Sequence, residues 1–215
     1  MTSSELDSGL ADLTQRVRAC RICVEHPIGP PLAHEPRPVL RPSSVARILI
    51  ASQAPGTKVH LSGMPFTDAS GDRLRSWLGV RSDEFYDTDN FAIVPMGFCF
   101  PGQDAKGADL PPRRECAPAW RAQLMAAMPQ IDLVLTIGLY AQAWHMGDAR
   151  RPSLTETVMN WREVFAASSR PLVLPLPHPS WRNTGWLKKN LWFEMELLPF
   201  LKSEIRRRIR QNRGT

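Results

Sequence analysis

Short apolar runs separated by amphipathic segments recur along the chain, and they predict strands that alternate with helices. Runs rich in branched apolar residues lie at 48–51, 91–96, 131–137 and 172–176, and a glycine or a proline follows each within four positions. Runs of this length are typical of strands covered on both faces. Such strands, alternating with helices, indicate a parallel sheet between helical layers. We therefore predict an α/β fold: a three-layer α/β/α sandwich around a central, mostly parallel four-stranded sheet.

Helical periodicity fills the segments between these runs. Apolar residues spaced by three or four positions predict helices over 4–18, 70–78, 113–128, 139–146, 153–165 and 190–210. Ser153 is a candidate N-cap, and Pro199 is expected to interrupt or kink the closing helix. The basic cluster at 206–210 is expected to be a solvated helix end. The proline-rich segment 27–42 is expected to wrap over the surface in an extended conformation.

The length and composition predict one domain. With 215 residues, of which 43% are hydrophobic, the chain suits a single domain over 1–215. It divides into an N-terminal helix, cysteine pair and wrap (1–46), a core (47–200) and a basic C-terminal end (201–215). No run reaches the length of a membrane span, and the acidic start does not resemble a signal peptide. We expect a cytoplasmic monomer with no membrane partner; the formal charge of +6 is compatible with a polyanionic partner but does not require one.

Polar and titratable residues gather after the first and the last predicted strand. The first loop opens with Ser52-Gln53-Ala54-Pro55-Gly56 and continues to His60, Phe66, Thr67 and Asp68. The second opens with Pro177-His178-Pro179-Ser180 and continues to Trp181, Arg182 and Asn183. Because the carboxyl ends of parallel strands share one edge of the sheet, we expect the two loops to form a single site.

Each of these residues also has an ordinary structural reading. The flanking prolines fix the ring of His178, which suits a donor to a developing anion, or equally a turn histidine bonded to backbone. Phe66 fits a stacking platform or a core plug, and Asp68 fits the N-cap of the helix that follows. His60 is a candidate base by proximity alone. The mixture of aromatic and basic residues at 180–189 suits a nucleic-acid strand, with rings for stacking and cations for phosphates, or a solvated turn.

Four cysteines point to metal or redox chemistry. In a cytosolic chain they argue against a disulfide framework. Cys20 and Cys23 form a CxxC pair, and Cys99 and Cys116 follow far along the chain. Together they are enough for a four-sulfur shell around zinc or an iron-sulfur cluster. The alternative is that Cys99 and Cys116 are buried apolar fillers.

Three short motifs in this order resemble those of the uracil-DNA glycosylase superfamily: Gln53-Ala54-Pro55-Gly56, Pro65-Phe66-Thr67-Asp68 and His178-Pro179-Ser180. The likeness runs from Cys20 to the closing helix, and the cysteine pattern is similar to that of the iron-sulfur-containing family four and five members. The resemblance implies a monofunctional hydrolase of base excision repair, which excises uracil from DNA. It also implies a structural [4Fe-4S] cluster, bound by Cys20, Cys23, Cys99 and Cys116, away from the chemistry.

The resemblance also implies roles for the site residues. Phe66 would stack on the extruded base, and the backbone around Gln53, Ala54 and Gly56 would line the pocket. His178 would hydrogen-bond the base oxygen on which negative charge accumulates. The loop Ser180, Trp181, Arg182, Asn183 and Thr184 would form the minor-groove wedge, with Trp181 or Arg182 filling the vacated space.

The sequence departs from the family pattern at two places. Relatives carry a carboxylate beside the motif proline, where this chain has Gln53 and Ala54. Asp68 is similar in position, within a one-residue gap, to an aspartate that family-five enzymes carry after their Phe-Thr. The resemblance therefore makes Asp68 our first choice for positioning the attacking water, with His60 second. Relatives also end the second strand with an asparagine that reads uracil, where this chain has 94–97, Val-Pro-Met-Gly. We expect a broader specificity that includes other deaminated bases.

Two other functions remain open from the sequence. One is a non-catalytic member of the same fold that binds uracil-containing or single-stranded DNA. The other is a metal-sulfur scaffold protein with no DNA role.

Overall fold

One parallel sheet forms the centre of the molecule. The computed structural model describes the backbone of residues 3–213 and the side chains of residues 7–212. Four strands lie in the order β2-β1-β3-β4, all parallel. They are β1 (Ile48–Ala51), β2 (Phe91–Ile93), β3 (Leu133–Ile137) and β4 (Leu172–Leu176). The predicted sheet is confirmed, and the bounds of β1 and β4 agree with the predicted runs.

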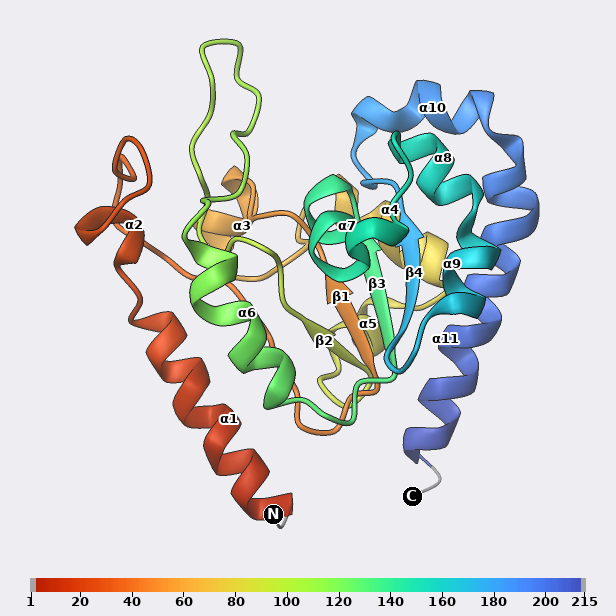
Figure 1. Cartoon of the computed structure of the whole chain (residues 1–215), viewed down its shortest axis with the longest axis horizontal. Helices are drawn as coiled ribbons and strands as arrows, with labels where there is room; N and C mark the ends of the chain where they lie inside the picture. The colour runs from red at the N-terminus through yellow and green to blue at the C-terminus, as the bar shows by residue number, and fades with distance from the viewer. Residues whose placement is uncertain (1–2, 214–215) are drawn as a thin grey trace.

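Helices precede, connect and follow the strands (Figure 1). In the described part of the chain they are α1 (Ser3–Arg18), α2 (Ile22–Glu25), α3 (Thr57–Ser62), α4 (Ala69–Leu78), α5 (Ser82–Tyr86), α6 (Cys116–Ala126), α7 (Leu139–Met146), α8 (Leu154–Met159), α9 (Trp161–Ala167), α10 (Thr184–Lys189) and α11 (Leu198–Arg213). Short 3-10 turns η1 (Gly147–Ala149) and η2 (Trp181–Asn183) and the π-helical segment η3 (Phe193–Leu197) complete the set.

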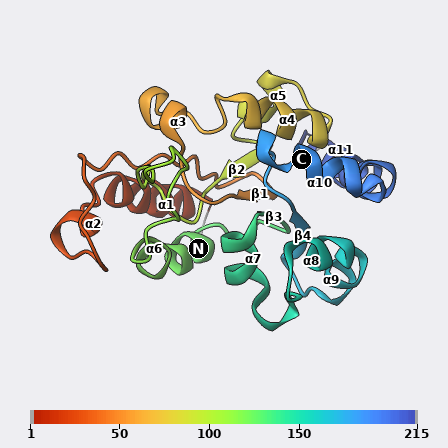
Figure 2. The same cartoon turned by 90° about the horizontal axis from the view of Figure 1, so that it is seen from above.

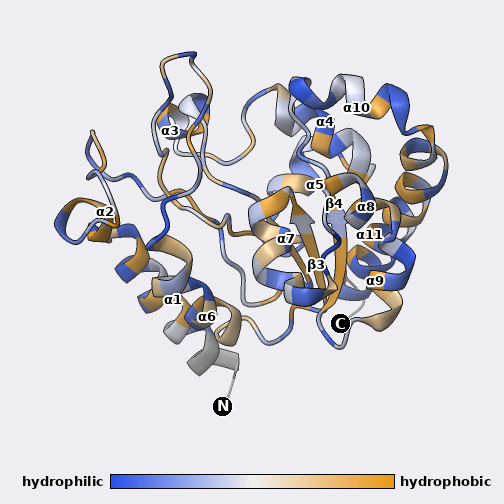
Figure 3. Ribbon diagram, turned by 45° about the horizontal axis from the view of Figure 1, so that its top comes forward, coloured by the Kyte–Doolittle hydropathy of each residue, from blue (hydrophilic) through white to orange (hydrophobic). Residues whose placement is uncertain are grey.

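The two faces of the sheet carry separate cores, which gives the three layers. Successive strand residues point to opposite faces, so Ile48 and Ile50 join one cluster and Leu49 and Ala51 join the other. The first cluster includes apolar residues of α4, α5 and α11, and the second those of α1, α6 and α7. Figure 2 shows α1 and α6 on one side of the strands and α4 and α5 on the other. Figure 3 shows the apolar colouring that runs along β3 and β4 between these helices. The predicted α/β/α sandwich is confirmed.

Proline and asparagine account for several differences from the predicted elements. β2 ends at Ile93, although extended pairing continues where the N–H of Met96 donates to the Ser52 carbonyl at 2.8 Å. The predicted helix 153–165 divides at Asn160 into α8 and α9, with Ser153 confirmed as the N-cap of α8. The closing helix changes to η3 just before Pro199, which has no N–H to donate to the preceding turn. The short helices α3 and α5 were not predicted.

The basic end of α11 is not a uniformly solvated helix end, so that expectation is wrong. The side chain of Arg208 is only 1% exposed and forms ion pairs with Asp132 and Glu204. Arg206 forms an ion pair with Glu84, which caps α5. These two cations therefore attach α11 to the body, because buried charges need paired partners. In the described chain, no helix is long and apolar enough to cross a membrane.

Candidate functional site

The loops after β1 and β4 meet in one cleft at the carboxyl edge of the sheet. The cleft has a volume of about 610 Å³, and the loop at 100–112 supplies a further wall. Of the residues singled out in the sequence, those that line it are Gln53, Ala54, Gly56, Phe66, Asp68, His178, Ser180, Trp181, Arg182 and Asn183. The expected convergence of the two loops on one site is therefore present.

The start of the first loop is held by backbone hydrogen bonds to the end of the neighbouring strand. The Gln53 carbonyl accepts from the N–H of Gly97 at 2.8 Å. The Gln53 side chain lies over Gly138, where a Cβ would approach its Nε2 to 2.5 Å. Gly138 also has φ +81°, so a residue with a side chain is disfavoured there for two reasons. The amide of Gln53 is thereby confined between the end of β1 and the start of α7.

Phe66 adopts a strained backbone conformation beside the cleft. It is the non-glycine residue with positive φ, +59°, in the described chain, a conformation that costs roughly 1–3 kcal/mol. Its carbonyl accepts from the Tyr86 hydroxyl at 2.9 Å and from Arg75 at 3.2 Å. A Cβ on Gly71 would lie 1.8 Å from the same carbonyl oxygen. The surroundings therefore impose the conformation of Phe66, whose ring also packs edge-on against Phe85.

Asp68 caps α4 and also lines the cleft. Its Oδ1 accepts from the N–H of Gly71 at 3.2 Å, which confirms the N-cap reading. A carboxylate has further acceptor sites, so capping does not prevent a second interaction.

His178 is fixed in a turn and lines the same cleft as Asp68 and Asp109. Its carbonyl accepts from the Asn183 side chain at 2.7 Å, and Arg73 donates to the Ser180 carbonyl at 2.8 Å. Burial lowers the pKa of His178, while the negative charges of Asp68 and Asp109 act in the opposite direction. Its pKa lies below the usual histidine range, so the ring is neutral at neutral pH and has one N–H to donate.

An exposed aromatic and a cation stand at the rim. The Trp181 side chain is 75% exposed, and the Arg182 guanidinium lies 5.7 Å from the centre of its ring. Such a pair suits base stacking and phosphate contact.

A comparison of the chain with known protein families agrees with this geometry. The family model of the uracil DNA glycosylase superfamily matches residues 41–202. The chain belongs to this superfamily. The match includes both cleft loops, Cys99 and Cys116, whereas Cys20 and Cys23 precede it. Membership in the superfamily suggests a uracil-DNA glycosylase-like activity with DNA as the substrate.

In this superfamily member, His60 lies outside the residues that line the cleft. Its ring packs at a tilt against those of His34, at 4.7 Å between centroids, and Phe100, at 5.8 Å. Burial, His34 and Arg37 lower its pKa, and its buried Nδ1 has no hydrogen-bond partner in the described chain. The geometry therefore offers less support for His60 than for Asp68 in positioning the water.

Sequence reasoning missed a buried cation under the cleft. The Arg121 side chain is 0% exposed and donates to the carbonyls of Val94, at 2.6 Å, and Pro95, at 3.3 Å. It also contacts Nε2 of His145 at 2.7 Å. Burial lowers the pKa of Arg121 to about 9 and that of His145 to about 3. Arg121 thus holds the segment at the end of β2, where Pro95 lines the cleft. The sequence feature that could have indicated this is a single charged residue within a largely apolar helix.

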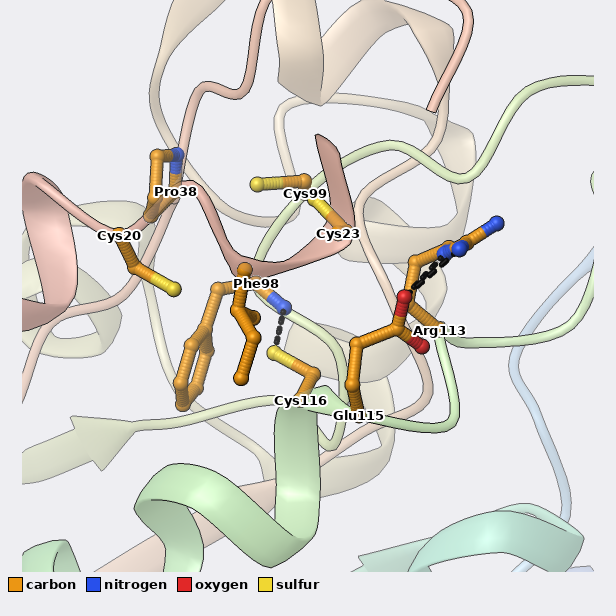
Figure 4. Close-up of a pocket in the computed structure, with 9 residues that line it drawn as sticks. Cys20, Cys23, Pro38, Phe98, Cys99, Arg113, Glu115 and Cys116 are labelled. Atoms are coloured by element: carbon orange, nitrogen blue, oxygen red, sulfur yellow. Dashed lines mark hydrogen bonds and ion pairs between the residues drawn. The ribbon is translucent and has the colours of Figure 1, made fainter. Parts of the chain in front are cut away.

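The four cysteines surround a second hollow, which we call the cysteine pocket (Figure 4). Cysteine and apolar side chains make up most of its lining, which also includes the ion pair of Arg113 and Glu115. Trp120 Nε1 lies 3.2 Å from the sulfur of Cys20, and the N–H of Phe98 lies 3.4 Å from that of Cys116. Burial raises the pKa of Cys99 and Cys116 to about 12. Thiolates in this pocket therefore need a compensating cationic centre.

The arrangement of possible ligand side chains around the cysteine pocket bears on which metal centre it could hold. Within the described residues, no three His, Cys, Asp or Glu side chains converge as a single metal ion requires. A four-iron cluster needs a wider arrangement, because each thiolate binds a different iron. Four cysteines line one hollow, and N–H donors point to two of the sulfurs, so the residues present supply the thiolate set that such a cluster requires.

Proposed function

We propose that the protein is a DNA repair glycosylase that hydrolyses the N-glycosidic bond of a flipped-out deoxyuridine. One observation carries the proposal: Phe66 and His178, from loops after different strands, line the same cleft. A nucleobase cannot be reached inside the duplex, so such an enzyme must extrude it into a pocket. A cleft with an aromatic side chain and a neutral hydrogen-bond donor suits the extruded base.

His178 would act on the leaving base. As the bond from sugar to base breaks, the electron pair moves to the base, and negative charge grows on its carbonyl oxygens. A neutral imidazole can donate a hydrogen bond to that oxygen and still keep its own proton. One well-placed donor of this kind is worth roughly a hundredfold to a thousandfold in rate.

Asp68 would position the attacking water. Its carboxylate lies in the cleft and acts on His178 electrostatically, so it would lie on the same side of the sheet as the bound nucleotide. Gln53 and Ala54 provide no carboxylate at the position used by relatives, which leaves Asp68 as the sequence-based choice. An asparagine at position 68 would keep the capping hydrogen bond from the N–H of Gly71. The variant Asp68→Asn therefore tests the effect of the negative charge by itself.

The rim would hold the DNA. Trp181 or Arg182 would fill the space that the extruded nucleotide leaves, and the surrounding cations would contact phosphates. Affinity should then fall as the salt concentration rises, because phosphate contacts release counterions.

Base recognition should be broad. The segment after β2 presents Pro95 to the cleft, and no asparagine side chain is available at 94–97 to read the uracil edge. Excision should therefore extend to other deaminated bases, and a panel of uracil, hypoxanthine and xanthine opposite each normal base measures the range.

We further propose that the cysteine pocket holds a [4Fe-4S] cluster, bound by Cys20, Cys23, Cys99 and Cys116. The cluster would serve as a structural crosslink between the N-terminal segment and the two ends of the 100–112 loop. Anaerobically purified protein should be brown and should contain about four iron and four sulfide per chain. A colourless, zinc-containing protein would contradict this assignment.

The test of the proposed function is strand scission. A uracil-containing oligonucleotide should become alkali-labile at the uracil, and Asp68→Asn should strongly reduce the rate. Asp148→Asn is the matched control, because Asp148 is exposed and does not line the cleft. Equal rates for wild type and Asp68→Asn would remove Asp68 from the mechanism.

The absence of a carboxylate at 53 and 54 favours one second candidate: a non-catalytic member that binds uracil-containing or single-stranded DNA. A salt-dependent gel shift without scission after alkali treatment would support it over the glycosylase.

A further inference from the structure

The loop at 100–112 is a built hairpin that stands beside the cleft (Figure 1). Gln103 and Asp109 form an antiparallel bridge, and the N–H of Leu110 donates to the Gly102 carbonyl at 2.9 Å. Near the tip, the N–H of Asp104 donates to the Ala108 carbonyl at 2.8 Å. These bonds fix which residues of the hairpin face the cleft.

Asp109 is the carboxylate that this hairpin directs into the cleft. It lines the cleft, and its Oδ2 lies 3.1 Å from the position of a Cβ on Gly56. Its Oδ1 accepts from Gln103 Nε2 at 3.1 Å, and no hydrogen bond to Oδ2 occurs within the described residues. Gly56 leaves room for this close approach, because a side chain there would crowd the carboxylate.

Asp109 and Asp68 act on the same histidine from different loops. Both negative charges influence His178, and all three residues line the cleft. Asp68 already uses one oxygen to cap α4. Asp109 likewise uses one oxygen, to accept from Gln103, so each carboxylate keeps a second oxygen with no hydrogen bond within the described residues. Asp109 presents this oxygen beside Gly56, two positions after Ala54 in the motif where relatives carry a carboxylate and this chain has none.

A carboxylate in a DNA cleft has a cost. It repels phosphates, so it weakens binding unless it contributes to the reaction. In a glycosylase reaction the sugar gains positive charge, which a nearby carboxylate stabilises, and water must be oriented toward that sugar.

We propose that Asp109 is a second water-positioning carboxylate, which acts with Asp68 in the hydrolysis; this rests on the proposed glycosylase function. The water oxygen forms a bond to C1′ while the bond from C1′ to the base nitrogen breaks. The electron pair of that bond goes to the base. The water proton passes to the carboxylate and from there to the departed base through solvent, which leaves a free base and an abasic sugar with a 1′ hydroxyl.

The experiment compares Asp109→Asn with Asp104→Asn in single-turnover excision at saturating protein, together with DNA affinity. Asp104 lies on the same hairpin, and its Oδ1 accepts from the N–H groups of Lys106 and Ala108, a role that Asn retains. Asp109→Asn should lower the excision rate roughly 10- to 100-fold with DNA affinity unchanged or tighter. Asp104→Asn should stay within about twofold of wild type in both measurements.

Two further variants separate chemistry from folding. Asp109→Ser removes the carboxylate without adding an amide and should be as slow as Asp109→Asn, with an unchanged melting temperature. The double variant Asp68→Asn with Asp109→Asn should be slower than either single variant. If Asp109→Asn or Asp109→Ser excises the base at the wild-type rate while Asp68→Asn is slow, the proposed role of Asp109 is overturned and that of Asp68 stands. If wild-type protein excises no base from any lesion, the proposed function and this inference both fall.

Discussion

The cysteine pocket and the cleft differ in nearly every physical property, although both lie where strands of one sheet end. The cysteine pocket is lined mainly by cysteine and apolar side chains, and burial raises the pKa of Cys99 and Cys116. The cleft is open, and polar and apolar groups share its surface about equally. An enclosed apolar pocket suits a group that stays bound, whereas an open polar cleft suits a substrate that enters and leaves.

The two regions share one connecting segment. The hairpin that carries Asp109 begins after Cys99 and ends before Cys116, so the cysteine pocket anchors a wall of the cleft. The comparison therefore predicts that changes in the cleft spare the cysteine pocket, while changes in the cysteine pocket reach the cleft through the hairpin.

His178→Ala should give the largest effect on excision. It removes the donor to the leaving base, so the single-turnover rate should fall roughly 100- to 1000-fold. Iron content should not change, because His178 does not line the cysteine pocket. The exposed His26 provides a control, since His26→Ala should behave as wild type. Comparable rates for both variants would remove His178 from the chemistry.

Gly71→Ala should give the next largest effect. The new methyl group would meet the Phe66 carbonyl, so the strained residue must move, and a displacement of about 1 Å can cost up to about 100-fold in rate. Gly185→Ala is the matched control, because a Cβ there meets nothing within 4 Å. An undiminished rate in Gly71→Ala would show that the position of Phe66 does not matter.

Cys116→Ala should act mainly on the cysteine pocket. Iron should fall from about four to below one per chain, and the melting temperature should drop, because the crosslink is lost. Excision by the remaining folded protein should fall only several-fold, through the loosened hairpin. Full iron content in this variant would mean that Cys116 is not a ligand.

The pH dependence of stability should give the smallest effect. The pKa of His145 is lowered to about 3 in the folded protein, so the unfolded chain takes up protons first as the pH falls below about 6.5. The folded state should lose about 1–2 kcal/mol between pH 7 and pH 5 from this residue. His178 and His60 act in the same direction.

Chemical denaturation at both pH values measures this loss. His145→Gln, which keeps an acceptor for Arg121, should reduce it. The same loss in wild type and His145→Gln would show that His145 does not carry the dependence.

Much of the architecture could be predicted from local patterns. β4 and α7 agree with the prediction because each is a short periodic run ended by proline or glycine. α3 was missed because its six residues lie in a segment rich in turn-forming residues. The buried state of Arg208 could not be predicted, since its partner Asp132 lies 76 positions away.

The candidate site, too, could be predicted only in part from the sequence. Its loops could be predicted because parallel strands end at one edge of the sheet. The place of Asp109 in the cleft could not be predicted, because hydrogen bonds within the hairpin 100–112 decide which of the two aspartates of this hairpin faces the cleft. The left-handed conformation of Phe66 depends on Gly71, Arg75 and Tyr86, which contact it only in the folded chain.

The central claim is that a single extruded base binds between Phe66 and His178. Its most direct test is the position of the target nucleotide in a crystal structure of the protein with DNA containing 2′-fluoro-2′-deoxyuridine, in which the fluorine slows bond cleavage. The account predicts the uracil ring in the cleft, against Phe66, with a carbonyl oxygen of the base within hydrogen-bond distance of His178. A uracil that stays stacked in the DNA, or that binds outside this cleft, would contradict it.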